Sequence, residues 1–145
     1  MTSKREQILS AFYTRLKTLE TSQIKVNRNQ DKPQKVPDGG LIILRDGQSD
    51  EPEVMLSPLT YIYEHSALLE IMVQNPDAAA RSNILDSLLV SIGALIAANR
   101  TLSGVAEWSE AKAPDFIDEP IEGAATIRAA TVAVLLRFST TDPLN

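Results

Sequence analysis

The stretch TYIYEHSALLEIMVQNPD (residues 60–77) decides the organisation of this 145-residue chain. Its first fifteen residues alternate between apolar and polar side chains in the manner of a β-strand. A helix is expected to follow, because Asn75 can cap the first free backbone N–H groups and Pro76 has no N–H to lose. Asp77 adds a negative charge at the positive helix end. The sequence therefore predicts a long strand followed by a helix that ends near Asn99.

The two faces of that strand differ in character. The odd-numbered residues from Tyr61 to Val73 are mostly apolar and are expected to face the core. The even-numbered residues mix charged side chains with Ile62, Leu68 and Met72. These three offer apolar area that a monomer has little reason to expose, so they are candidates for a subunit contact.

The predicted helix has one apolar face. The opposite face, which we call the back of the helix, is unusual. Leucine and isoleucine recur at helical spacing in residues 85–96 and form the apolar face. The back carries no charge over residues 87–98, although a solvated helix face normally carries Lys and Glu. It is expected to be covered by another subunit or by the chain's own loops. The uncharged run is too short for a membrane span, which needs roughly 20 apolar residues. The residues at the centre of this back are Val90, Gly93 and Ala94.

The rest of the chain reads as one α+β domain over residues 1–145. Ser3 and Glu6 form a capping box that begins an amphipathic helix. Two segments rich in Pro, Gly and charge are predicted to be a mobile basic loop (27–40) and an acidic loop (111–123). The fold class is a mainly antiparallel sheet of about five to six strands with two helices packed on one face. The first helix is expected over residues 4–19, and the other strands near residues 23–28, 41–45, 54–56 and 124–139.

Composition excludes several classes of protein. The chain has no cysteine, which removes disulfide scaffolds, thiolate nucleophiles and thiolate metal sites. Its first residues, MTSKREQ, are polar and lack the apolar core of a signal peptide. A cytoplasmic location follows as the default expectation.

The net charge of −5 is unevenly distributed. Residues 1–36 hold eight basic and three acidic side chains, whereas the remaining 109 residues hold six basic and sixteen acidic ones. The basic part is expected to meet nucleic acid, to meet the acidic part of a neighbouring copy, or to be an ordinary solvated surface. Only weak, non-specific DNA contact is predicted, because the basic segment lacks interleaved aromatic residues. Its candidate contact residues are Lys25, Arg28, Lys32 and Lys35.

No constellation of residues indicates a catalytic site, a cofactor or a metal. The only histidine, His65, has Ser66 beside it, and neighbours in a strand point to opposite faces. We therefore interpret His65 as a structural residue. The carboxylates of the acidic loop do not follow the order of a calcium-binding loop, so a solvated surface is the interpretation we favour. We expect the protein not to be an enzyme.

Two segments carry a resemblance to a known family. Residues 99–104 read NRTLSG, and the chain closes on EGAATIRAATVAVLLRFSTTDP (residues 122–143). This pattern resembles the tail terminator or minor tail protein family of long-tailed bacteriophages and prophages. In that family a helix ends in a D/N-R-T-L-x-G segment and a final long strand ends in an aromatic residue.

The resemblance implies an α+β subunit that forms a homo-oligomeric ring, commonly a hexamer. Such a ring caps the head-proximal end of the tail tube, stops tube polymerisation and joins head to tail. Its implied partners are the tail-tube protein and a head-completion protein, in the virion tail and in the host cytoplasm during assembly. The basic loop is then expected to face the ring lumen or the tube. The alternatives are a small adaptor or nucleic-acid-binding module and another head-tail completion protein.

Overall fold

The computed structural model describes residues 2–31, 35–119 and 127–145. Within them the chain forms two helices and a seven-stranded, mostly antiparallel sheet, which confirms the predicted α+β class. The sheet has more strands than predicted because residues 108–111, and residues 115–119 inside the segment expected to be an acidic loop, also form strands. The elements are α1 (Lys4–Lys17), β1 (Ile24–Arg28), β2 (Gly40–Ser49), β3 (Glu53–Leu56), β4 (Leu59–Gln74), α2 (Ala78–Ala98), β5 (Trp108–Ala111), β6 (Asp115–Glu119) and β7 (Ile127–Thr140).

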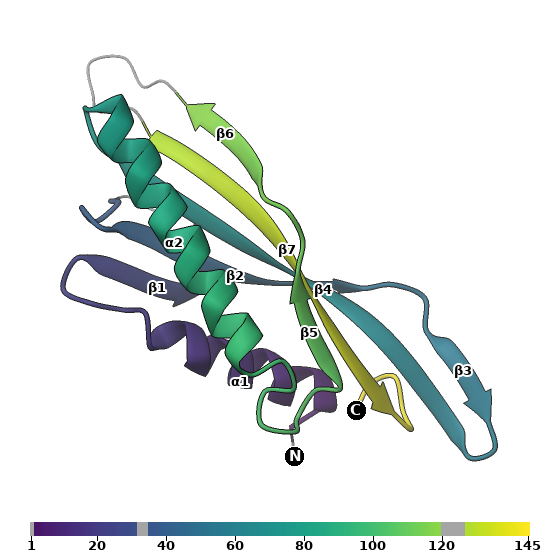
Figure 1. Cartoon of the computed structure of the whole chain (residues 1–145). Coiled ribbons are helices and arrows are strands. Elements are labelled where there is room, and N and C mark those ends of the chain that lie inside the picture. The colour runs from purple at the N-terminus through teal and green to yellow at the C-terminus, as the bar shows by residue number, and fades with distance from the viewer. Residues whose placement is uncertain (1, 32–34, 120–126) are drawn as a thin grey trace.

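The two longest strands, β4 and β7, form the middle of the sheet (Figure 1). The strand order is β1-β2-β4-β7-β5, with β3 paired to β4 and β6 paired to β7. Only β1 and β2 are parallel, and every other pairing is antiparallel. The central pair β4 and β7 is not consecutive in the chain, because α2, β5 and β6 lie between them in the sequence.

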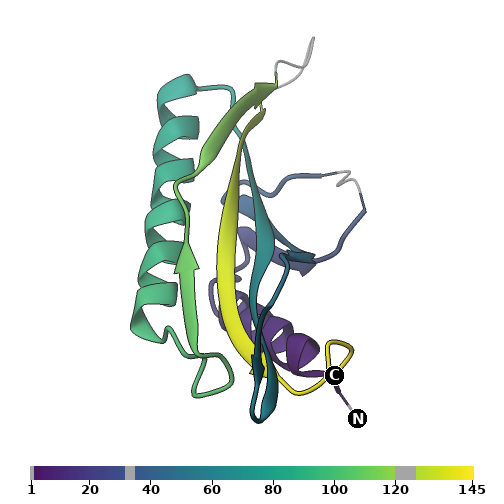
Figure 2. The same cartoon turned by 90° about the vertical axis from the view of Figure 1, so that its right-hand side faces the viewer.

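Both helices pack on one face of the sheet, as predicted. Buried side chains of α1 and α2 belong to the same apolar cluster as alternate residues of β2, β4 and β7. Figure 2 shows α2 as a layer beside the sheet. The guanidinium of Arg15 also donates a hydrogen bond to the backbone oxygen of Leu95 (3.0 Å), which ties α1 to α2. The predicted core face of β4 is confirmed from His65 to Val73, where every odd-numbered residue is buried.

The helix caps agree with the sequence for α1 and differ for α2. Ser3 is the N-cap and accepts a hydrogen bond from the backbone N–H of Glu6 (3.1 Å), which is one half of the predicted capping box. The Glu6 carboxylate accepts instead from Arg28 and Ser10. The N-cap of α2 is Asp77 rather than Asn75, since the Asp77 carboxylate accepts from the N–H of Ala79 (3.3 Å). Asn75 instead accepts from the N–H of Asp77 (2.8 Å) and so orders the residues that precede the helix.

The predicted basic loop is shorter than expected. Residues 27 and 28 belong to β1 and residue 40 belongs to β2. Val36 is buried against Leu41 and Ile43 on the sheet face that the helices leave open. This apolar contact holds the second half of the segment against the sheet, which sequence pattern alone did not indicate.

The predicted acidic loop is interrupted by a strand. Residue 111 belongs to β5, and β6 pairs with β7 through contacts such as Ile117 opposite Ala129. Phe116 and Ile117 supply the strand-forming side chains among the acidic residues. Residues 120–123 of the predicted loop lie outside the described residues.

A bulge bends β2 away from regular pairing with β4. The register shifts between Arg45 and Gln48, and Gly47 between them has a positive φ of 70°. A Cβ atom added to Gly47 would lie 1.9 Å from the backbone oxygen of Ser66. Only glycine fits this position without movement of the backbone.

We predict that Gly47→Ala lowers the free energy of unfolding by at least about 2 kcal/mol, because it adds both a positive-φ penalty and a backbone clash. Gly93→Ala is the matched control. Gly93 lies inside α2 with nothing within 4 Å of its added Cβ, so this change should stabilise the monomer by roughly 0.5–1 kcal/mol. Urea unfolding followed by the fluorescence of Trp108 measures both. Equal effects of the two substitutions would contradict the account.

Candidate interaction surfaces

His65 is a buried structural residue whose two ring nitrogens are both engaged. Nδ1 lies 2.7 Å from the hydroxyl of Ser49, and Nε2 contacts the backbone oxygen of Asp46. A carbonyl can only accept, so Nε2 carries the proton and Nδ1 accepts from Ser49. Burial lowers the pKa of His65, against the opposing effect of the Asp46 carbonyl. His65 therefore fixes the bulge of β2 against β4 in its neutral form.

Arg28 is held by carboxylates on the helix side of the sheet. Its Nη1 and Nη2 atoms donate to the two carboxylate oxygens of Glu6 (2.8 Å each), and its Nε donates to Asp46 (2.8 Å). The hydrogen bonds from Arg28 lower the pKa of Glu6 to about 2, and those carboxylates raise the pKa of Arg28. Arg28 thus ties α1 to β1 and β2, and its guanidinium, named above as a candidate contact, is engaged by carboxylates of its own chain.

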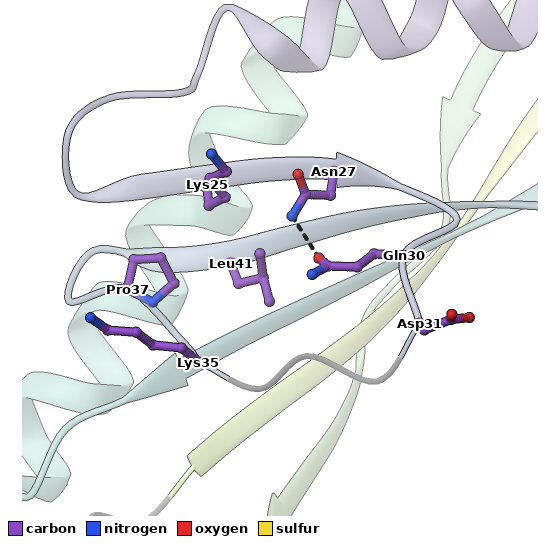
Figure 3. A pocket seen from close by; sticks show the side chains of 7 residues that line it. All are labelled: Lys25, Asn27, Gln30, Asp31, Lys35, Pro37 and Leu41. Atoms are coloured by element: carbon purple, nitrogen blue, oxygen red, sulfur yellow. Dashed lines mark hydrogen bonds between the residues drawn. The ribbon is translucent and has the colours of Figure 1, made fainter.

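Lys25 and Lys35 lie together on the other side of the sheet. Both are exposed and line a recess of about 440 Å³ beside the start of β2 (Figure 3). Asn27 and Gln30 close one side of it through a hydrogen bond of 2.6 Å. Lys32, the fourth predicted contact residue, lies outside the described residues. The structure therefore brings two of the four cations together and places Arg28 elsewhere.

Ile62, Leu68 and Met72 share the face of β4 that the helices leave open, and all three are half-buried. Met72 packs against the small cluster of Val36, Leu41 and Ile43, so part of its apolar area is used inside the chain. Leu68 lies opposite Ala133 of β7. These residues form a row along one strand rather than a single compact patch.

The back of α2 is open. Val90 is 63% exposed, Ala94 is exposed, and no atom lies within 4 Å of a Cβ built on Gly93. The sequence left two possibilities for what covers this back, another subunit or loops of the same chain. None of the loops among the described residues covers it. After Asp86, every exposed residue of α2 is uncharged.

The whole of α2 is longer than the uncharged run of residues 87–98. With 21 residues, Arg81 and Asp86 among them, the helix is long and apolar enough to cross a membrane by length and composition. Its Leu85, Leu88, Ile92 and Ile96 side chains are buried against the sheet, however. The apolar face of α2 is thus already used in the core, as in the core helix of a globular domain.

The hairpin of β3 and β4 is a surface that the sequence analysis did not single out. We call residues 53–59 the arm. It projects beyond the helices at one end of the sheet (Figure 1), with a Ser57-Pro58 turn whose peptide bond is cis. The uncharged run VMLSPL after the acidic QSDEPE is the signal that could have identified it. Its exposed apolar residues are Val54, Met55, Leu56 and Leu59.

The NRTLSG segment has a structural role at the end of α2. Asn99 accepts from the N–H of Ser103 (2.9 Å), and Leu102 is buried although its φ is positive. Arg100 and Ser109 exchange hydrogen bonds through their side chains and backbone oxygens (3.0 and 2.7 Å). These contacts stop the helix and position β5. They involve no arrangement that would activate a nucleophile.

In the described part of the chain, no three His, Asp or Glu side chains are grouped so as to hold a metal ion. Comparison of the chain with models of known protein families gives no match. Comparison with curated protein sequences gives no significant match either.

Acid should weaken the fold through His65. Its folded pKa lies below its usual value, so the unfolded state binds more protons below about pH 6.5, and stability falls with decreasing pH. When the pH is lowered from 7 to 5.5, the unfolding free energy of the wild type should fall by up to about 1 kcal/mol more than that of the His65→Gln variant. Urea titrations of both proteins at each pH measure this difference. Glu6 contributes little here, since its stabilisation is fully present above its ordinary pKa of 4.5 and is lost only as the pH falls from there toward its folded pKa of about 2. Parallel pH profiles would contradict this role of His65.

Proposed function

We propose that this chain is a non-catalytic assembly subunit that associates with copies of itself into a ring. On this proposal the ring caps the head-proximal end of the tail tube of a long-tailed phage or prophage. There it ends tube polymerisation and joins head to tail, in contact with a tail-tube protein and a head-completion protein. The subunit would assemble in the host cytoplasm and act in the virion tail.

The observation that carries the proposal is the open, uncharged back of α2. Exposed helices normally carry charged residues, whereas after Asp86 the helix α2 exposes only Val90, serines, a glycine and alanines. None of the described loops covers this surface. Depletion of charge is the compositional mark of the centre of a protein interface. A partner that buries this back is the simplest account of a helix with such a composition.

The form of the assembly is suggested by the differences between the surfaces. The arm, the back of α2 and the recess of Lys25 and Lys35 are chemically unlike one another. Contacts between unlike surfaces are heterologous, and they close into rings when the rotation between subunits allows. The specific place in a phage tail rests on the resemblance of the NRTLSG segment and the final strand to the tail terminator family.

The ion pairs of Arg28 weaken the alternative that this chain is a nucleic-acid-binding module. Its guanidinium is occupied by Glu6 and Asp46, and its side chain is mostly buried. Lys25 and Lys35 are exposed, but two cations release few counterions and supply little electrostatic affinity. Weak, non-specific contact with DNA is the most that this pair supports.

We expect the wild type to show concentration-dependent association by light scattering, and Ala94→Arg to reduce it strongly by placing a charge on the back of α2. Thr14→Arg, on an exposed position of α1, is the matched control and should associate as the wild type does. Neither change touches the core, so both variants should unfold at temperatures close to that of the wild type. Wild type that stays a monomer at high concentration and moderate salt would contradict the proposal.

A further inference from the structure

The base of the arm carries a dense group of exposed carboxylates. Asp50, Glu51 and Glu53 are all exposed, and among the residues whose side chains the structure describes no other run of four holds three exposed carboxylates. None of the three forms an ion pair with a described residue. The tip beside them is apolar, and its Leu56 is 81% exposed. Charge without a counter-charge, beside an exposed apolar tip, indicates a partner whose surface is basic and partly apolar.

The chain itself offers few exposed cations. Of its described lysines and arginines only Lys25, Lys35 and Lys112 are exposed, and all the others are half-buried. Lys112 stands alone after β5, at the far edge of the sheet from β1. Lys25 and Lys35 line one recess, and neither forms an ion pair with a described residue. Within the described part of the chain, this recess is therefore the place where two exposed cations meet.

The recess lies on the open face of the sheet and is partly apolar. Lys25 of β1 is the register partner of Leu41 of β2, so both side chains lie on the same face. Leu41 belongs to the apolar cluster on that face, and Pro37 lines the recess with it. Figure 3 shows both lysines near Pro37, and Asp31 at the other end with its carboxylate directed away from them. The recess thus combines two cations with an apolar floor.

Strand β3 presents a matching pair of side chains on one of its faces. Glu53 and Met55 lie two residues apart, so their side chains point to the same side of the strand. Both side chains are exposed. A carboxylate and an apolar side chain on one face complement a lysine and an apolar floor on another.

The arm and the recess of one chain cannot meet. The recess lies at the start of β2, and the arm comes after the end of β2. The 10 residues of this strand span roughly 30 Å. Figure 1 shows the arm projecting away from the start of β2. An arm that occupies the recess must therefore come from another copy of the chain.

We propose that the arm of one copy docks on the recess of the next copy, with Glu51 and Glu53 opposite Lys25 and Lys35 and with Met55 on the apolar floor. This inference rests on the proposed ring and names one of its contacts. The contact joins opposite ends of two subunits, so it is head-to-tail, and its repetition closes a ring when the subunit rotation allows. It lies on the open face of the sheet, whereas α2 covers the other face, so the back of α2 is tested separately (Figure 2).

Mixing two charge-reversed variants tests the contact. The arm variant Glu51→Lys/Glu53→Lys and the recess variant Lys25→Glu/Lys35→Glu should each self-associate about tenfold or more weakly than the wild type, because like charges then face each other. An equimolar mixture should regain association, since each arm then meets a recess of opposite charge on the other variant. Light scattering at low ionic strength measures all three samples. The four substituted residues are exposed, so both variants should keep the wild-type unfolding temperature.

A control variant separates this contact from a general effect of charge. Glu110→Lys/Asp115→Lys reverses two exposed carboxylates on β5 and β6, at the other edge of the sheet. This variant should associate as the wild type does. Salt gives a second measurement, because raising the ionic strength from about 0.05 M to about 0.5 M screens exposed ion pairs and should weaken wild-type association several-fold.

The outcomes distinguish this contact from the ring itself. Four results would each overturn the docking contact and leave the proposed ring intact: reversed variants that associate as the wild type does, a mixture that regains nothing, a control variant weakened as much as the arm variant, or wild-type association that salt does not change. A wild type that stays a monomer at high concentration, at both low and moderate salt, overturns both.

Discussion

The antiparallel pairing of β4 with β7 is the contact on which the rest of this structure depends. The two strands stay in register from Tyr61 opposite Thr140 to Gln74 opposite Ile127, without a bulge. Every other strand except β1 pairs directly with one of them. Because side chains alternate along a strand, this one register assigns all their residues to a helix-covered face or to an open face. A shift by one residue would exchange the two faces.

The length of this pairing exceeds what the helices can cover. The apolar parity of β4 and β7 is buried under α1 and α2 along most of the sheet. Beyond the helices, the same strands continue to Leu59 and Thr140, and β3 extends that end with further apolar side chains. The arm therefore follows from a mismatch between sheet length and helix cover.

Partly buried polar contacts on the helix side join α1 to the β1–β2 end of the sheet. Asp46 accepts from Arg28 through its carboxylate and from His65 through its backbone oxygen, at the bulge that Gly47 permits. One short turn thus joins α1, β1, β2 and β4. Removal of one partner from such a network leaves the others with unmet hydrogen bonds, which costs more than the net value of the bond. Arg28 and Asp46 are consequently structural, although both look like ordinary surface charges in the sequence.

Local pattern was a sound guide wherever one short segment decided the outcome. The alternation of β4, the Ser3 N-cap of α1 and the apolar spacing of α2 each depend on neighbours within a few residues, and the structure confirms them. The N-cap of α2 was assigned two residues early, because Asn75 and Asp77 are both good caps and only backbone geometry selects one. Strand β6 was missed because Asp and Glu surround its two apolar residues, and the pairing with β7 that stabilises it is distant in the sequence.

For the candidate surfaces too, some properties follow from residue order along one element and others follow only from tertiary contacts. The sequence by itself determined the fold class, the core face of β4 and the uncharged back of α2, since each is a property of side-chain order along one element. Only the tertiary structure decided that this back is exposed, that Arg28 is occupied on the opposite side of the sheet from Lys25, and that the arm projects past the helices. The physical reason is that exposure and ion pairing depend on which distant segments come together, and sequence order does not record this.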